Sequence, residues 1–154
     1  MIRNVAAADQ AALLALNNAH AIELSALSAV RLSALLEMAY AARVVGTAEA
    51  FLLAFDEAAA YDSPNYLWFR ERYERFVYID RIVVAPAARG HGLARSLYAD
   101  LIAQVSGRSM LACEINVDPP NPASDALHAS LGFSGAGHGA VGGKFVRYLT
   151  RTLA

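Results

Sequence analysis

The stretch Ile82-Val83-Val84-Ala85-Pro86-Ala87-Ala88-Arg89-Gly90-His91-Gly92-Leu93-Ala94-Arg95 joins a segment of strand character to a segment of helical periodicity. The β-rich run 76–84 is typical of a strand that is buried on at least one face. Pro86 cannot continue a central strand, so we expect the strand to end before it. The apolar residues that follow recur at helical spacing in two adjacent rows: Leu93, Leu97, Leu101 and Val105, then Ala94, Tyr98 and Ile102.

The turn between this strand and this helix is predicted to bind an anion. Gly90 and Gly92 remove side chains where the backbone turns, which allows a ligand to approach closely. The first amide N–H groups of a helix lack internal partners and lie at the positive end of the helix dipole. Together with Arg89 or Arg95, these donors favour a phosphate or a pyrophosphate.

The spacing within the turn excludes two common nucleotide-binding loops. A P-loop requires Gly-Lys-Ser/Thr at the helix start, and the sequence Gly-His-Gly-Leu lacks both the lysine and the hydroxyl. The dinucleotide fingerprint requires a small third residue, and Arg95 stands at that position. The pattern that remains is Arg-x-x-Gly-x-Ala, formed by Arg89, Gly92 and Ala94. On this stretch alone, a glycine-rich turn leading into an ordinary amphipathic helix is the alternative.

Composition narrows the class of protein. A chain of 154 residues is long enough for one domain with a sizeable core, and its formal net charge of -1 with no basic run argues against nucleic-acid binding. Charged residues interrupt the apolar N-terminal third, so no run reaches membrane-spanning length, and no signal-peptide pattern is present. The single cysteine, Cys113, excludes an internal disulfide and a cysteine-based zinc cluster. We therefore expect a reducing, cytoplasmic setting.

Strands interleaved with helices, with some strands paired in hairpins, indicate an α/β domain with a mixed sheet. We expect helices at 11–21 (with Asp9 as N-cap), 29–41, 66–74, from 93 to Gly107 or Arg108, and 121–131. We expect strands at 1–6, 42–45, 49–55, 76–84, 110–117, 133–140 and 144–153.

Two clusters outside the turn each have two interpretations. Four hydrogen-bonding side chains crowd the end of the first expected helix, where they form either a solvated helix end or an acceptor-binding edge: Asn17, Asn18, His20 and Glu23. Seven of the fourteen aromatic residues lie between positions 61 and 78. Phe69 and Phe76 are expected in a local core. For Tyr61, Tyr66 and Trp68, a local core and the wall of an acceptor pocket both remain open.

A second motif lies on the helix that begins at Asn121. Asn121, Ser124 and His128 are spaced i, i+3, i+7 and share one face. The run Asn121-x-x-Ser124-x-x-Leu127-His128-x-x-Leu131-Gly132-Phe133 is similar to the pattern Asn-x-x-Ala-x-x-Leu/Phe-Tyr-x-x-x-Gly-Phe of the GNAT superfamily of N-acetyltransferases. The Arg-x-x-Gly-x-Ala turn resembles the acyl-CoA pyrophosphate loop of the same superfamily. The two patterns occur in that superfamily's order, and the resemblance covers roughly residues 78–133.

The resemblance implies a single domain over residues 1–154, with a mixed, mostly antiparallel sheet of about six or seven strands flanked by helices. It implies acetyl-CoA as the acyl donor, lying between two central strands that splay apart, and no metal. The residues expected to contact the cofactor are Ile82, Val83 and Val84 on the pantetheine arm, Arg89, Gly90, His91, Gly92, Leu93, Ala94 and Arg95 on the pyrophosphate, and Asn121 and Ser124 on the pantetheine or cofactor end.

The resemblance also implies direct transfer of the acetyl group to an amine, with a strand N–H polarising the thioester carbonyl. The amine must lose a proton first. Glu114 is the first candidate base, by its position relative to ribosomal-protein N-terminal acetyltransferases, and Asp80 is the second. A surface position for Glu114 and pairing of Asp80 with an arginine are the alternatives. His128 replaces the tyrosine that protonates the departing thiolate in many members, so it is either the general acid or a residue without that role.

Three functions follow from these patterns. The first is an acetyl-CoA-dependent N-acetyltransferase acting on a small molecule or a peptide N-terminus. The second is a non-catalytic acyl-CoA binding or sensing domain on the same fold, which the His128 substitution supports. The third, a nucleotide-phosphate module of another fold, is disfavoured by the loop spacing. Nucleic-acid and membrane partners are not expected, and a homodimer is compatible with the sequence.

Overall fold

The computed structural model describes residues 1–20 and 24–153. Its strands are β1 (Ile2–Asn4), β2 (Ala41–Val45), β3 (Ala50–Asp56), β4 (Val77–Val84), β5 (Met110–Asp118), β6 (Ser134–Val141) and β7 (Lys144–Thr152). Its helices are α1 (Gln10–Ala19), α2 (Ala29–Met38), α3 (Pro64–Arg70), α4 (Leu93–Gln104) and α5 (Pro122–Ser130), with 3-10 turns η1 (Ala7–Asp9) and η2 (Pro86–Ala88). The strands form one mixed, mostly antiparallel sheet in the order β1-β2-β3-β4-β5-β7-β6, which confirms the expected fold class.

The chain divides into two compact units, each described here by itself. The first contains Met1–Phe55 and Asp80–Val105, and the second contains Asp56–Ile79 and Ser106–Ala154. The division runs through β4, so this strand contributes its first residues to one unit and its last residues to the other.

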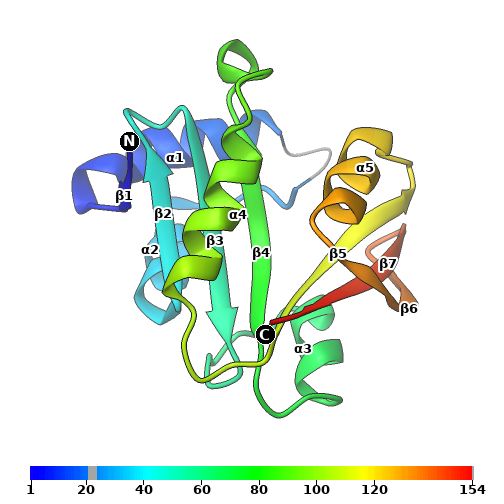
Figure 1. Cartoon of the computed structure of the whole chain (residues 1–154). Coiled ribbons are helices and arrows are strands. Elements are labelled where there is room, and N and C mark those ends of the chain that lie inside the picture. The colour runs from blue at the N-terminus through cyan, green and yellow to red at the C-terminus, as the bar shows by residue number, and fades with distance from the viewer. Residues whose placement is uncertain (21–23, 154) are drawn as a thin grey trace. The chain divides into compact units, whose positions relative to one another are not determined.

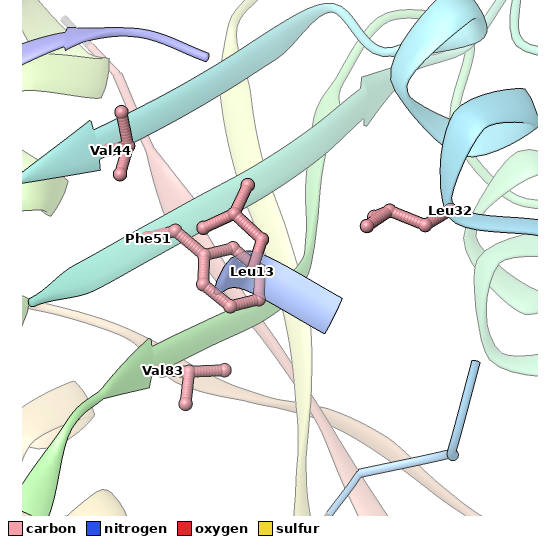
Figure 2. Close-up of a cluster of buried hydrophobic side chains, with 5 residues drawn as sticks. All are labelled: Leu13, Leu32, Val44, Phe51 and Val83. Atoms are coloured by element: carbon pink, nitrogen blue, oxygen red, sulfur yellow. The ribbon is translucent and has the colours of Figure 1, made fainter. Parts of the chain in front are cut away.

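In the first unit, helices cover both faces of the strands. Figure 1 shows α1 and α2 on one side of β2 and β3, and α4 on the other. Residues 50–55 of β3 are all buried, as expected for a strand covered on both faces. A cluster that includes Leu13 of α1 and Leu32 of α2 packs on Val44, Phe51 and Val83 of the strands (Figure 2). These contacts hold the end of β4 in place, and with it the start of the predicted anion-binding loop.

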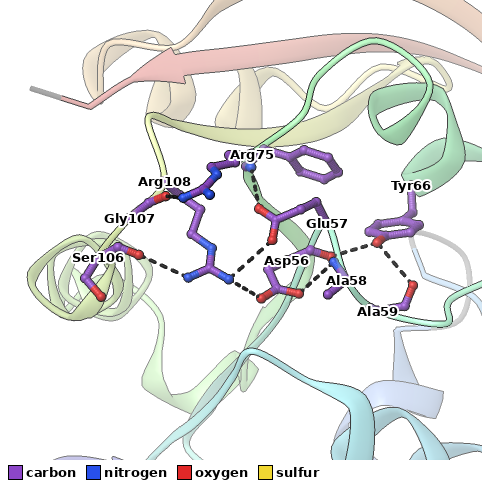
Figure 3. Close-up of polar contacts among 10 residues, drawn as sticks. Asp56, Glu57, Ala58, Ala59, Tyr66, Arg75, Ser106, Gly107 and Arg108 are labelled. Carbon is purple, nitrogen blue, oxygen red and sulfur yellow. Dashed lines mark hydrogen bonds and ion pairs between the residues drawn. The ribbon is translucent and has the colours of Figure 1, made fainter.

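In the second unit, β5 pairs in parallel with the start of β4 and antiparallel with β7, and β6 lies outside β7. The aromatic residues gather in its core, where Tyr66, Phe69, Phe76 and Tyr78 are wholly buried. A polar cluster ties residues 56–57 to residues 106–108 (Figure 3). In that cluster Arg108 donates to Asp56 at 2.6 Å and to Glu57 at 3.3 Å.

Most expected elements are confirmed within a few residues, and the differences have local causes. The carboxylate of Asp9 does not cap α1, because it turns back to accept from the Ala6 N–H and from the Arg3 guanidinium. Helix α2 ends at Met38, before Ala41 pairs with Ala54 in the sheet.

The start of helix α3 and the end of helix α4 also differ by a few residues from their predicted positions. Helix α3 begins at Pro64, which is favoured in the first helical turn, rather than at residue 66. Helix α4 ends at Gln104, because Val105 is already extended. Residue 21, the predicted end of the first helix, lies outside the described residues. Among the helices that the structure describes, none is both long enough and apolar enough to cross a bilayer.

Candidate functional site

The loop between β4 and α4 has the backbone geometry that the sequence predicted. The strand ends at Val84, and the next amide, that of Ala85, donates to the Glu49 carbonyl at 2.8 Å. Gly90 and Gly92 have φ angles of 84° and 70°, in the left-handed region that favours glycine. A Cβ atom at either position would meet nothing within 4 Å, so the space beside both glycines is open.

Helix α4 begins directly after Gly92, and no side chain caps it. The first helical hydrogen bond runs from the Ser96 N–H to the Gly92 carbonyl. The preceding amides, at residues 93–95, therefore have no acceptor within the helix. Open space, the first amides of the helix and the positive end of the helix dipole together make this loop a site that can bind an anion.

Two arginines lie on this loop, and both are exposed. Nη2 of Arg89 lies 3.1 Å from Nε2 of His20, at the end of α1. Because Nδ1 of His20 lies 2.9 Å from the Leu16 carbonyl, that nitrogen carries the proton and Nε2 accepts from the guanidinium. His91 likewise donates through Nδ1 to the Ala88 carbonyl at 3.1 Å.

In the second unit, Glu114 lies on β5 and is partly exposed. The hydroxyl of Tyr78, on β4, donates to Oε1 of Glu114 at 2.6 Å. On the other neighbouring strand, β7, Tyr148 is the register partner of Glu114. Burial and the charge of Glu114 raise the pKa of Tyr148, and Arg72 lowers it by a smaller amount. A carboxylate in this setting can accept a proton from an amine.

Helix α5 carries the three polar residues of the second motif. Asn121 is its N-cap, and its side-chain oxygen accepts from the Ser124 N–H at 3.2 Å. His128 is 5% exposed, and its Nδ1 lies 2.7 Å from the Ser124 carbonyl and 3.3 Å from the Ser124 hydroxyl. The carbonyl can only accept, so Nδ1 of His128 carries a proton. The three residues lie on one side of the helix, as their spacing predicted.

The model of the acetyltransferase (GNAT) family matches residues 27–133. The chain belongs to this acetyltransferase family. The matched segment contains both motifs, the whole of β4 and β5, and the loop between β4 and α4.

Two curated relatives resemble parts of this acetyltransferase. A phosphinothricin N-acetyltransferase from Alcaligenes faecalis is 41% identical over 81 residues, which are 51% of this chain and 41% of the relative. A phosphinothricin N-acetyltransferase from Streptomyces coelicolor is 38% identical over 68 residues, 44% of this chain and 40% of the relative. The chain thus spans about two fifths of the length of the curated relatives that it matches.

Solved structures share the fold over nearly the whole chain. The structure of yncA from Salmonella typhimurium, solved with its cofactor acetyl-CoA, has a TM-score of 0.75 at 24% identity, and the match covers 100% of this chain and 94% of that one. A ribosomal-protein-alanine N-acetyltransferase from Brucella melitensis has a TM-score of 0.74 at 24% identity, covering 99% of both chains. At these identities, the likeness concerns the fold.

Asp80, the second candidate base of this acetyltransferase, forms an ion pair with a neighbouring arginine. Its side chain is 5% exposed, and its Oδ2 lies 2.6 Å from Nε of Arg81. Arg81 in turn donates to Oδ1 of Asn17, a wholly buried residue. The alternative for Asp80, pairing with an arginine, is therefore the arrangement found, and Glu114 is the better-placed carboxylate.

The polar side chains at the end of α1 mostly form hydrogen bonds within the protein. Asn17 donates to the Ser25 carbonyl at 3.0 Å, and Asn18 donates to the Leu27 carbonyl at 3.0 Å. A solvated helix end is therefore wrong for Asn17. Glu23, the fourth member of the predicted cluster, lies outside the described residues.

The buried tyrosines of the aromatic group follow the core interpretation. Tyr61 and Tyr66 are 7% and 0% exposed, and their ring centroids lie 5.5 Å apart. Trp68 is partly exposed and stacks on Tyr148 with a centroid distance of 4.2 Å. Cys113 is buried. The described residues hold no group of three or more His, Cys, Asp or Glu side chains that could bind a metal.

Tyr78 is the residue that the sequence analysis missed. Its only signal in the sequence was its position in a strand two residues before Asp80. The contact with Glu114 depends on the parallel register, which pairs Tyr78 with Ala112 and so places it beside a residue two further along β5. A strand register of this kind cannot be read from the spacing of either strand alone.

Proposed function

We propose that this chain is an acetyl-CoA-dependent N-acetyltransferase that transfers the acetyl group directly to an amine. The observation that carries the proposal is the loop between β4 and α4, where two left-handed glycines in open space precede the first amides of helix α4. Membership of the acetyltransferase family gives that anion site its expected occupant, the pyrophosphate of an acyl-CoA.

The residues proposed to hold the cofactor each have a specific task. The amides of residues 90–95 donate to the pyrophosphate, and the guanidinium groups of Arg89 and Arg95 add positive charge. The backbone of residues 82–84 pairs with the pantetheine arm. The Asn121 side-chain oxygen is occupied by its cap bond, so this residue would use its amide nitrogen toward the cofactor. When bound, acetyl-CoA supplies an activated thioester.

Glu114 is the proposed general base. An ammonium substrate transfers one proton to the Glu114 carboxylate, which leaves a neutral amine with a free electron pair. The amine nitrogen then forms a bond to the acetyl carbon, the bond from carbon to sulfur breaks, the thiolate leaves, and the nitrogen releases a second proton to give the neutral amide. A strand N–H donates to the developing oxyanion in this step.

His128 is a poor source of the proton that the thiolate takes up. Its Nδ1 proton is directed at the Ser124 carbonyl, and burial lowers the pKa of the ring, which disfavours the imidazolium. This observation supports the second function, a domain that binds acyl-CoA without transferring the acyl group. If the chain is an N-acetyltransferase, the thiolate takes its proton from a donor other than His128.

The acceptor is proposed to be a small amine. The two curated relatives are named as phosphinothricin N-acetyltransferases, so an amino acid of that kind is the first acceptor to test. A peptide N-terminus is the second. The buried thiol of Cys113 is compatible with the cytoplasm, which we propose as the compartment.

The proposed function is tested by measuring acetyl-CoA binding by calorimetry and CoA release with a panel of amines and peptides. We expect binding, together with CoA release that depends on the amine. Glu114→Gln should lower kcat strongly and leave the acetyl-CoA Kd nearly unchanged, whereas Asp118→Asn, at the exposed end of the same strand, should change neither. Binding without release for any amine would favour the non-catalytic function. Absence of binding by a folded protein would overturn both functions.

A further inference from the structure

Tyr78 and Glu114 lie on two neighbouring strands and form a pair in which Tyr78 is buried and Glu114 is partly exposed. Tyr78 is 0% exposed, whereas Glu114 is partly exposed, so the phenol lies in the core and the carboxylate lies at its edge. The distance of 2.6 Å between the hydroxyl and Oε1 is typical of a hydrogen bond to an ionised oxygen. This is a short, charge-assisted contact between two side chains rather than incidental proximity.

The ring of Tyr78 is held on several sides. Its centroid lies 5.6 Å from that of Tyr66 and 5.8 Å from that of Phe69, with the first pair edge to face. Both neighbours are wholly buried. The ring therefore cannot move away without disturbing the core, and its hydroxyl presents a donor at a fixed point.

We propose that Tyr78 is the positioning residue of Glu114: its phenol fixes the orientation of the carboxylate and keeps it ionised. The proposal rests on the proposed function, in which Glu114 is the general base. In that role, the carboxylate must be ionised before the ammonium substrate arrives. A hydrogen bond donated to the ionised form favours that form over the protonated one.

The groups around Glu114 fit this assignment. Tyr148 lies opposite on β7, and its own hydroxyl donates to the side-chain oxygen of Asn65 at 2.9 Å. Burial raises the pKa of Tyr148, and the negative charge of Glu114 adds to this, so Tyr148 stays a neutral phenol near neutral pH. Arg72 is the cation that acts on Tyr148 in the opposite direction. Tyr148 thus donates to Asn65, whereas Tyr78 donates to the carboxylate.

The test removes the Tyr78 hydroxyl and uses Tyr66 as a matched control. Tyr66 is equally buried, belongs to the same aromatic cluster, and donates its hydroxyl to the Asp56 carbonyl at 2.7 Å. Tyr78→Phe should move the acidic limb of the kcat/KM profile to higher pH by about one unit, and lower kcat several-fold with little change in the KM for acetyl-CoA. Tyr66→Phe should leave the acidic limb of the kcat/KM profile at the same pH.

A second substitution keeps the shape of the side chain at position 78 and changes the strength of its hydroxyl as a hydrogen-bond donor. Placing 3-fluorotyrosine at position 78 retains the shape of the ring but makes the hydroxyl a stronger donor, so the limb should move to lower pH. The same two directions should appear when the titration of the Glu114 carboxyl is followed by NMR. An unmoved titration in both variants would overturn the proposal. Because the NMR titration needs no turnover, it gives its answer even if the wild-type protein releases no CoA, and the two failures are distinguishable.

Discussion

Nη1 of Arg81 lies 2.9 Å from Oδ1 of Asn17, and both residues are buried in the first unit. The same guanidinium holds Asp80 through Nε at 2.6 Å and the Ser25 carbonyl through Nη1 at 3.3 Å. Helix α1 is therefore joined to β4 by a buried, charged network. The strand that it fixes is the one that leads into the loop proposed to bind acetyl-CoA.

Removing Arg81 from this network should lower the free energy of unfolding substantially. In Arg81→Met, the buried Asp80 carboxylate loses its guanidinium partner, and we expect the free energy of unfolding to fall by about 3–5 kcal/mol. Asn17→Ala removes one neutral partner and should cost about 1–3 kcal/mol. Urea unfolding followed by circular dichroism measures both. Glu37→Gln, on the exposed side of α2, is the control and should change little. A loss below about 1 kcal/mol for Arg81→Met would show that the network is not a main source of stability.

The stability of the protein should depend on the protonation of His128. Burial lowers the pKa of His128, so below its ordinary pKa of about 6.5 the unfolded chain binds more protons than the folded chain. The contribution of this residue is therefore complete above that pH and is lost as the pH falls through it. Unfolding curves at about pH 7.5 and about pH 5.5 should show a smaller difference for His128→Gln than for the wild type. By NMR, His128 should titrate below its ordinary range, and a normal titration would contradict the expectation.

Two glycines of β6 offer a matched pair of substitutions. A Cβ at Gly137 would lie 2.6 Å from Cζ2 of Trp68, which stacks on Tyr148 and cannot retreat easily. Gly137→Ala should therefore cost about 1–3 kcal/mol. At Gly135, a Cβ would meet the flexible end of Arg147 at 3.2 Å, so Gly135→Ala should be tolerated. Trp68 is the sole tryptophan, and its fluorescence should change in the first variant only. Equal stability of the two variants would argue against this packing.

His20 should influence the affinity for acetyl-CoA through Arg89. His20→Ala removes the acceptor that holds the Arg89 guanidinium, and we expect the acetyl-CoA Kd to rise by about 2- to 10-fold. Arg89→Ala should raise it at least as much, because the charge itself is lost. Calorimetry with acetyl-pantetheine, which lacks the pyrophosphate, should give equal affinities for the wild type and both variants. Glu37→Gln, which changes an exposed charge on α2 of the same unit, should bind acetyl-CoA normally. If His20→Ala also binds it normally, its contact with Arg89 has no role in binding.

Local sequence patterns predicted the elements that carry the proposed cofactor site. Pro86 and the two glycines marked the end of β4 and the turn, and Asn121 with Pro122 marked the start of α5. These features depend on φ preferences and capping within a few residues, which a sequence displays directly. Asp9 is the N-cap of α1 as predicted, but its carboxylate makes no cap bond because local donors compete for it, and the predicted end of α2 was wrong because β2 pairs with a distant strand.

The sequence by itself therefore determined the family, the order of the elements and the loop with its left-handed glycines. Only the tertiary structure decided how the titratable side chains are used. Asp80 and Glu114 are both carboxylates on strands, yet one is held by a buried guanidinium and the other by a phenol at the edge of the core. That difference arises from strand register and from helix packing, which bring together residues 36 and 64 positions apart in the chain. Long-range contacts of this kind decide which partner holds each carboxylate, because charge and burial act through space rather than along the sequence.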